Sequence, residues 1–230
     1  MPLLRIPFPS DLAKRLLFLI IILLFAGQNF LFGQVSNSIP ENVPEVTHFT
    51  TRRLESQSSG MKVLAGWAAV SIASGVALSL NSSSKAKYAG YQAVGWGAVN
   101  AAIAGFALYG IGQDFAGLDS ISNSSSALLS ELNEEHSFSK VLLVNLGLDV
   151  GYMGVGITLM ALSRNRKNED ALFGSGIGVL IQGAFLLGFD LWQFLLSTSR
   201  HAPLEDALRT RLVFTPSPIH DLGVLISFSF

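Results

Sequence analysis

Four long apolar segments constrain the fold of this chain more than any other feature. They cover residues 61–80, 88–111, 141–162 and 171–196. A helix rises about 1.5 Å per residue, so each segment is close to the roughly 20 residues needed to cross about 30 Å of hydrocarbon. Charged residues make up only 13% of the chain, whereas soluble domains carry about 25%. The sequence therefore predicts an all-α membrane protein with a four-helix transmembrane bundle over residues 61–197.

Residues 1–34 have the composition of an export signal. Three basic residues precede an unbroken apolar run, Leu16–Ala26. This run of about 11 residues is too short to span a bilayer, which favours a signal peptide. An uncleaved signal anchor is the alternative. The polar stretch 35–60 contains two prolines and is predicted to be an extracytoplasmic linker.

The charges of the connections predict the orientation. The two short connections carry five basic residues, Lys85, Lys87, Arg164, Arg166 and Lys167. The long connection, residues 112–140, is acidic and has one basic residue, Lys140, at its edge. The positive-inside tendency places the short turns in the cytoplasm, and the signal segment predicts the same arrangement. We therefore expect a multi-pass protein of the bacterial inner (cytoplasmic) membrane with its C-terminus outside.

Two segments outside the spans have patterns of their own. Residues 126–135 fit either an amphipathic helix on the membrane surface or a solvated loop. In the extracytoplasmic tail, residues 198–230, the stretches Leu208–Phe214 and Leu222–Phe230 resemble strands, and the second alternates with period two. These stretches predict a short β-hairpin-like tail. An isolated hairpin is marginally stable, so a partner surface on the bundle or on another chain is expected.

Small residues recur at i, i+4 spacing in every span. The rows are Ala65, Ala69, Ala73 and Ala77; Ala93, Gly97, Ala101 and Gly105; Gly147 and Gly151; and Gly174 and Gly178. Such rows let helix backbones approach closely in lipid, where hydrophobicity does not drive association. They predict a compact bundle. They are also candidate faces for self-association.

Five polar residues are expected at membrane depth: Asn100, Asn145, Asp149, Gln182 and Asp190. Helix rise places Asn100, Asp149 and Gln182 near the middle of the bilayer, and Asn145 and Asp190 roughly 10 Å toward the outside. The third and fourth spans contain no lysine or arginine that would pair with the aspartates. Polar groups at this depth are costly and need partners. The five residues therefore predict a polar cluster that extends from the midplane outward.

Two interpretations of this cluster remain open. It is either a hydrogen-bond network that fixes helix register or a site for a proton, an ion or a small ligand. An intramembrane enzyme is the least favoured alternative. Helix rise separates Asp149 from Asp190 by roughly 6 Å along the membrane normal, which argues against a catalytic acid pair.

Several classes of function are not expected. The chain contains no cysteine, which removes thiol chemistry, disulfides and zinc–thiolate sites. HExxH, GxSxG and GxxxxGK[ST] patterns do not occur. We expect no catalytic residue, no metal and no cofactor. A net charge of −1 gives no bulk attraction to nucleic acid.

Three blocks of sequence resemble a known family. They are Gly95-Trp-Gly-Ala-Val-Asn100 with Ala104-Gly-Phe-Ala-Leu-Tyr-Gly110; Asn145-Leu-Gly-Leu-Asp149-Val-Gly-Tyr152; and Gly176 with Gln182-Gly-Ala-Phe-Leu-Leu-Gly-Phe-Asp190. This pattern resembles an uncharacterised family of small bacterial four-helix membrane proteins, over roughly residues 60–195. The resemblance implies an architecture and no activity.

We therefore expect a non-enzymatic membrane protein with a structural, assembly or interaction role at the bacterial envelope. The alternative function is a small proton or ion conduit, or a carrier, that uses the Asp/Asn/Gln cluster. The expected partners are the lipid bilayer and either a protein or a second copy of this chain. A protein partner would be bound through the tail or through the small-residue faces.

Overall fold

The computed structural model describes residues 46–164 and 166–214, which are helical almost throughout. The elements are α2 (Val46–Ser79), α3 (Ser84–Ala116), the short 3₁₀ helix η1 (Leu118–Ser120), α4 (Ser125–Ser163) and α5 (Glu169–Phe214). The four α-helices are long and apolar enough to cross a membrane. The predicted all-helical architecture with four candidate spans is thus confirmed. The predicted signal segment lies outside the described residues.

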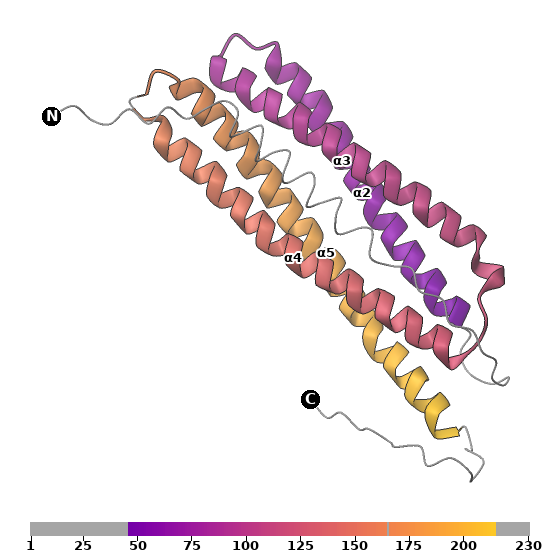
Figure 1. Cartoon of the computed structure of the whole chain (residues 1–230). Coiled ribbons are helices and arrows are strands. Elements are labelled where there is room, and N and C mark those ends of the chain that lie inside the picture. The colour runs from indigo at the N-terminus through magenta and orange to yellow at the C-terminus, as the bar shows by residue number, and fades with distance from the viewer. Residues whose placement is uncertain (1–45, 165, 215–230) are drawn as a thin grey trace. The chain divides into compact units, whose positions relative to one another are not determined.

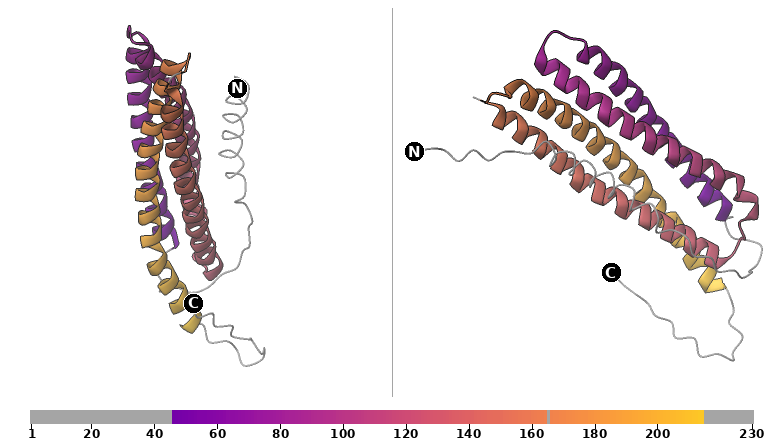
Figure 2. Two further views of the ribbon diagram at one scale, coloured as in Figure 1. Left: turned by 90° about the vertical axis from the view of Figure 1, so that its left-hand side faces the viewer. Right: turned by 45° about the horizontal axis from the view of Figure 1, so that its top comes forward.

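The helices form two antiparallel pairs, α2 with α3 and α4 with α5 (Figure 1). Helix α5 contacts each of the other three and joins the pairs. The turns that follow Ser79 and Ser163 define one end of the bundle, which we call the turn end (Figure 2). At the opposite end, the far end, the start of α2 meets the α3–α4 connection, and Val46 N–H donates to Asn123 Oδ1 at 3.4 Å.

Helices α4 and α5 pack along a seam with a period of seven residues. On α4 the buried positions at this spacing are Leu128, Glu135, Leu142, Asp149, Gly156 and Ser163. On α5 they are Gly176, Gly183, Asp190, Ser197, Leu204 and Arg211. A seven-residue period keeps one line of side chains facing a partner helix, as in coiled coils. The two aspartates of the predicted cluster therefore belong to one seam.

Glycine sets the closest approach of the helices at the turn end. A Cβ on Gly156 would lie 2.8 Å from the Gly176 carbonyl oxygen, and a Cβ on Gly176 would lie 2.7 Å from the Gly156 carbonyl oxygen. No real Cβ is tolerated at such distances, so the α4–α5 contact at this level requires both glycines. Gly75 and Gly90 make an equivalent contact between α2 and α3.

The predicted small-residue rows are used only in part. Gly97 packs against α2, and Gly174 and Gly178 pack against α3. Around the Cβ positions of three others, Gly105, Gly147 and Gly151, there is open space within the described part of the chain. Those three do not contribute to packing within the bundle.

Exposed tyrosines mark the apolar length of the bundle. On α3, Tyr91 is 57% exposed near the turn end and Tyr109 is 70% exposed farther along. The two tyrosines are 18 positions apart, which corresponds to about 27 Å of helix and is close to the hydrocarbon thickness of a bilayer. Tyrosine is enriched at membrane interfaces. The bundle continues past Tyr109 at the far end, beyond the apolar length that the two tyrosines delimit. This part, which we call the far-end segment, consists of residues 46–60, 112–140 and 197–214.

The far-end segment differs from the sequence-based expectation in three places. The predicted linker is helical from Val46 onward, since α2 begins there. Residues 126–135 are neither a separate surface helix nor a loop, because α4 runs unbroken through them. The first predicted arm of the hairpin, Leu208–Phe214, is the last part of α5, and the hairpin prediction is wrong there. The second arm, residues 222–230, lies outside the described residues.

Packing at the far end explains these differences. A buried apolar cluster joins three helices there and consists of Val46, Leu128, Leu132, Leu204 and Ala207. Leu204, Ala207 and Leu208 recur at helical spacing and bury one face of α5 on α2 and α4. A short apolar stretch alone does not distinguish helix from strand. The neighbouring helices decide in favour of helix.

Candidate functional site: a carboxyl pair inside the bundle

Two carboxyl groups meet in the α4–α5 seam. Asp149 on α4 is 2% exposed and Asp190 on α5 is 6% exposed. Their side chains lie close enough to interact with each other, and Asn145 interacts with Asp190. The structure thus brings the Asp149 and Asp190 carboxyl groups together, with Asn145 near Asp190.

This proximity corrects the expectation that Asp149 and Asp190 are too far apart to form a pair. The two residues are offset along the seam, because the Asp149 carbonyl oxygen lies beside Gly183, which is seven residues before Asp190 on α5. Side chains on a helix lean toward its N-terminus. In antiparallel helices the two side chains therefore lean toward each other and close the offset.

The environment of this pair limits its charge. Inside an apolar bundle the effective dielectric is low, and two ionised carboxylates in contact repel each other strongly. The third and fourth spans supply no lysine or arginine as a counter-charge. The pair is therefore stable only when it shares a proton or when a bound cation neutralises it.

Several buried polar atoms in the bundle lack a hydrogen-bond partner. Among the described residues these include Asp149 Oδ2, Tyr152 Oη, Asn100 Nδ2, and Nε2 and Oε1 of Gln193. More than nine in ten buried polar groups in native structures are hydrogen-bonded, so such atoms need a physical explanation. They give the bundle interior both donor and acceptor capacity for a small polar ligand.

Tyr152 connects the pair to α3. It follows Asp149 by three residues on α4, which places the two on one face. Its ring packs edge-to-face on Trp96 with centroids 5.2 Å apart. Asn100 lies one turn farther along α3 and is 2% exposed. Asn100 is thus buried as predicted, on a different helix from the pair.

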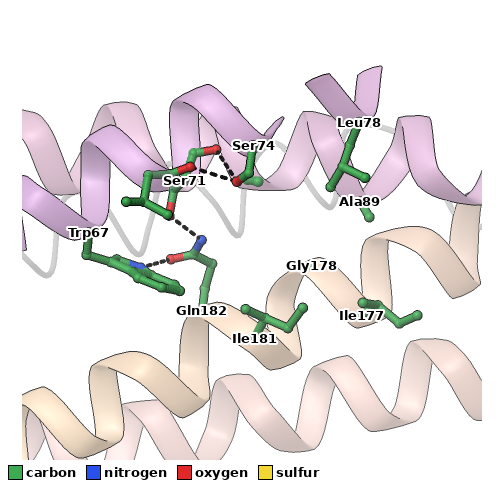
Figure 3. A pocket seen from close by; sticks show the side chains of 11 residues that line it. Trp67, Ser71, Ser74, Leu78, Ala89, Ile177, Gly178, Ile181 and Gln182 are labelled. Carbon is green, nitrogen blue, oxygen red and sulfur yellow. Dashed lines mark hydrogen bonds between the residues drawn. The ribbon is translucent and has the colours of Figure 1, made fainter. Parts of the chain in front are cut away.

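Gln182 has a separate environment. Trp67 Nε1–H donates to its Oε1 at 2.8 Å, and its Nε2–H donates to Ser71 Oγ at 3.1 Å (Figure 3). Both ends of the carboxamide are satisfied by α2. Gln182 also lines a cavity of about 240 Å³ between α2, α3 and α5. It therefore clamps α5 to α2 and is not part of the carboxyl pair.

A second polar layer lies in the far-end segment, and sequence reasoning missed it. Glu131 on α4 pairs with Arg53 on α2 at 2.7 Å and accepts from Thr50 Oγ1 at 3.0 Å. Burial lowers the pKa of Arg53, but the hydrogen bond and charge of Glu131 outweigh burial and hold that pKa above its ordinary value. The sequence of this stretch suggested either an amphipathic helix on the membrane surface or a solvated loop.

The second ion pair of this layer joins α4 to α5. Glu135 is 1% exposed and pairs with Arg200, whose Nη2–H donates to Glu135 Oε2 at 3.1 Å. Arg200 also donates to Ser56 Oγ on α2 at 2.9 Å. Glu135 precedes Asp149 by two seven-residue periods. That spacing is the signal in the sequence that could have placed Glu135 inside the bundle.

We expect the far-end segment to lose stability in mild acid because of His201. The pKa of His201 lies below its ordinary value of 6.5, mainly because the ring is partly buried and also because of the charge of His136. The unfolded chain therefore binds this proton more readily than the folded chain. The contribution of neutral His201 to the free energy of unfolding is fully present above pH 6.5. It is lost as the pH falls through the lower pKa that His201 has in the folded state.

Thermal unfolding of the purified protein between pH 7.5 and 5 measures this effect. The groups that face His201 are His136, Glu135, Glu205 and Ser139. A His201→Gln variant keeps a polar side chain but removes the titratable group, and it should flatten the decline in melting temperature with falling pH. An unchanged decline in that variant would assign the effect to other groups.

Taken together, these features define a class: a four-helix bundle with membrane-spanning length and a buried acidic pair. The chain belongs to a family of unknown function (DUF6992), which matches residues 63–191, more than half of its length. This range includes all five predicted polar residues, as well as Glu131 and Glu135. No curated protein matches the chain. No solved structure matches it either.

Proposed function

We propose that this chain is a non-enzymatic multi-pass membrane protein that binds and exchanges protons or a small cation at the Asp149–Asp190 pair. The contact between two buried carboxyl groups without a basic partner in their spans carries this proposal. Such a pair changes its proton or cation content with little structural change. This property suits a conduit or carrier.

Access to the pair favours ion exchange over hydrolysis. Aspartyl hydrolases also use two carboxyl groups that share a proton. Here both aspartates are buried in the seam between two closely packed helices. A proton or a small ion fits between such helices, whereas a peptide or lipid substrate requires an open cleft at the reacting carboxyls.

We propose the inner membrane as the location, with the turn end in the cytoplasm. Lys85, Lys87 and Arg164 belong to the basic residues of the turn end, which supports this orientation. The far-end segment then lies outside the cytoplasm. Cysteines introduced at Ser82 and at Asp119, tested with a membrane-impermeant thiol reagent on intact cells, check the orientation. We expect labelling at position 119 and none at position 82. Labelling at position 82 and not at position 119 would show the opposite orientation.

Proton flux into liposomes tests the exchange function. We expect the purified protein to acidify the vesicle interior under an inward proton gradient, and Asp149→Asn to lower the initial rate at least tenfold. Asp206→Asn, an exposed acid on α5, is the matched control and should retain the wild-type rate. Equal fluxes in wild type and empty liposomes, with protons or with sodium, would refute the exchange function.

A structural or assembly role is the second candidate. The far-end segment supports it, because its apolar cluster and two buried ion pairs form a rigid element beyond the apolar length of the bundle. Partner capture with wild type and with a chain lacking residues 215–230 tests this role. The deletion should stop at residue 215, since Leu204 and Ala207 belong to the folded bundle.

A further inference from the structure

A chain of hydrogen bonds connects the surface of the far-end segment to its buried interior. His201 Nε2 lies 3.2 Å from Ser139 Oγ. Ser139 Oγ lies 2.8 Å from Ser197 Oγ. Ser197 Oγ–H donates to Glu135 Oε2 at 2.7 Å. With His201 Nε2–H as the first donor, all three hydrogen bonds point toward Glu135.

The outer end of this chain is open to water. The rings of His201 and His136 pack edge-to-face with centroids 4.5 Å apart. His136 Nε2 lies 3.8 Å from Glu205 Oε1, and these two side chains are 38% and 54% exposed. Histidine exchanges protons near neutral pH. A proton from solvent thus has a titratable acceptor at the start of the chain.

Gln193 occupies the interval between this chain and the carboxyl pair. On α5 it lies four residues before Ser197 and three residues after Asp190, so the three share one face. Gln193 is 1% exposed, and neither polar atom of its carboxamide has a partner among the described residues. On its other side it contacts Gly60 of α2, where an added Cβ would lie 2.5 Å from Gln193 Nε2. The α2 backbone therefore covers Gln193.

We propose that His201, Ser139, Ser197 and Gln193 form the path by which protons reach the Asp149–Asp190 pair from the far end. The proposal rests on the exchange function proposed above and gives it a direction of access. The Gln193 carboxamide holds a water molecule that completes the path to Asp190. Glu135 orients Ser197 and, with Arg200, fixes the charge beside it.

In proton transfer along this path, each group gains one proton and releases one. His201 takes a proton at Nδ1 and releases one from Nε2. Each serine hydroxyl accepts a proton on its oxygen and passes its own proton onward, and for this the Ser197 hydroxyl turns from Glu135 Oε2 to the water at Gln193. The water at Gln193 delivers one proton to the carboxylate of the pair. One proton moves inward and leaves His201 as its Nδ1–H tautomer, with the hydroxyls and the water reoriented. The imidazole ring and these groups must turn back before the next proton can follow.

Infrared spectroscopy tests the path without requiring net transport. The protonated carboxyl group of the pair gives a C=O band, which is assigned by its disappearance in Asp149→Asn. On transfer to D₂O this band shifts at the rate of proton exchange. We expect Gln193→Leu to slow this shift at least tenfold, because leucine holds no water. Ser139→Ala, a second variant with a minimal change of volume, should also slow it.

Gln182→Leu is the matched control. Gln182 is a buried glutamine on the same helix, with its own partners on α2 and on the turn-end side of the pair. It should leave the exchange rate unchanged. Wild-type exchange in both Gln193→Leu and Ser139→Ala, or slowing by Gln182→Leu alone, would overturn the path.

The two proposals fail in different ways. Flux that needs Asp149 but is unaffected by Gln193→Leu, together with unchanged exchange, refutes the path and leaves the exchange function intact. Slowed exchange without any liposome flux supports the path and refutes transport. If wild type shows no carboxyl band that depends on Asp149, the pair holds no proton and the path is overturned.

Discussion

Arg200→Ala is expected to lower the free energy of unfolding by about 3–5 kcal/mol. The variant leaves the Glu135 carboxylate, 1% exposed, without the guanidinium that neutralises it. It also removes the hydrogen bond from Arg200 to Ser56 and so loosens α2 from α5. Chemical or thermal unfolding of the detergent-solubilised protein, followed by circular dichroism, measures the loss.

Two further variants separate the charge effect from general damage to α5. Arg209→Ala removes an exposed arginine from the same helix and should change stability by less than about 0.5 kcal/mol. Arg200→Met combined with Glu135→Leu removes both charges and should recover most of the loss, because a buried pair is often replaceable by apolar groups. A double variant as unstable as Arg200→Ala would show that packing, and not the unpaired charge, dominates.

Gly156→Leu is expected to prevent α4 and α5 from packing at the turn end. Even the Cβ of the new side chain would lie 2.8 Å from both the Gly176 carbonyl oxygen and the Leu180 nitrogen. These are backbone atoms and cannot rotate away, so the helices must separate. Gly156→Ala should cost about 1–3 kcal/mol by the same mechanism, and leucine should cost more.

Gly154→Ala is the control for this prediction. It lies on the same helix, two residues away, and its Cβ position has open space within the described part of the chain. Alanine favours the helix over glycine by about 0.8–1.0 kcal/mol. Gly154→Ala should therefore be neutral or stabilising in the same unfolding experiment. Similar losses for both alanine variants would show that the α4–α5 contact is not limited by Gly156.

These two predictions concern the same structural element as the carboxyl pair. Gly156 lies one seven-residue period from Asp149 along the seam, and Glu135 lies two periods away on the other side. The close glycine contact and the buried ion pair thus hold the helices on both sides of the aspartates. Loss of either should also disturb the distance between the two carboxyl groups.

The architecture followed from local properties of the sequence. Each span is a long apolar run, and an apolar run of that length with few charges indicates a helix wherever its neighbours lie. The polar residues were found for the same reason, since Asp149 and Asp190 interrupt apolar runs that are otherwise free of charge. Both signals need only the composition of a short window.

The α4–α5 seam was not found, although it is periodic. Hydrophobic patterns reveal a coiled-coil seam when apolar residues repeat, whereas this seam contains Glu135, Ser197, Gly156 and both aspartates. The hairpin prediction failed for a related reason. Residues 208–214 resemble a strand when taken alone, and the burial of Leu204 and Ala207 against α2 and α4 extends the helix through them.

The sequence by itself determined the four helices, their apolar lengths and the polar residues inside them, because these depend on residues close together in the chain. Only the tertiary structure decided which polar groups meet. Asp149 contacts Asp190, and Glu135 contacts Arg200, because antiparallel helices bring side chains from opposite sides of a turn into register. Those contacts depend on helix register, tilt and the direction in which each side chain leans. No single segment of the sequence contains that information.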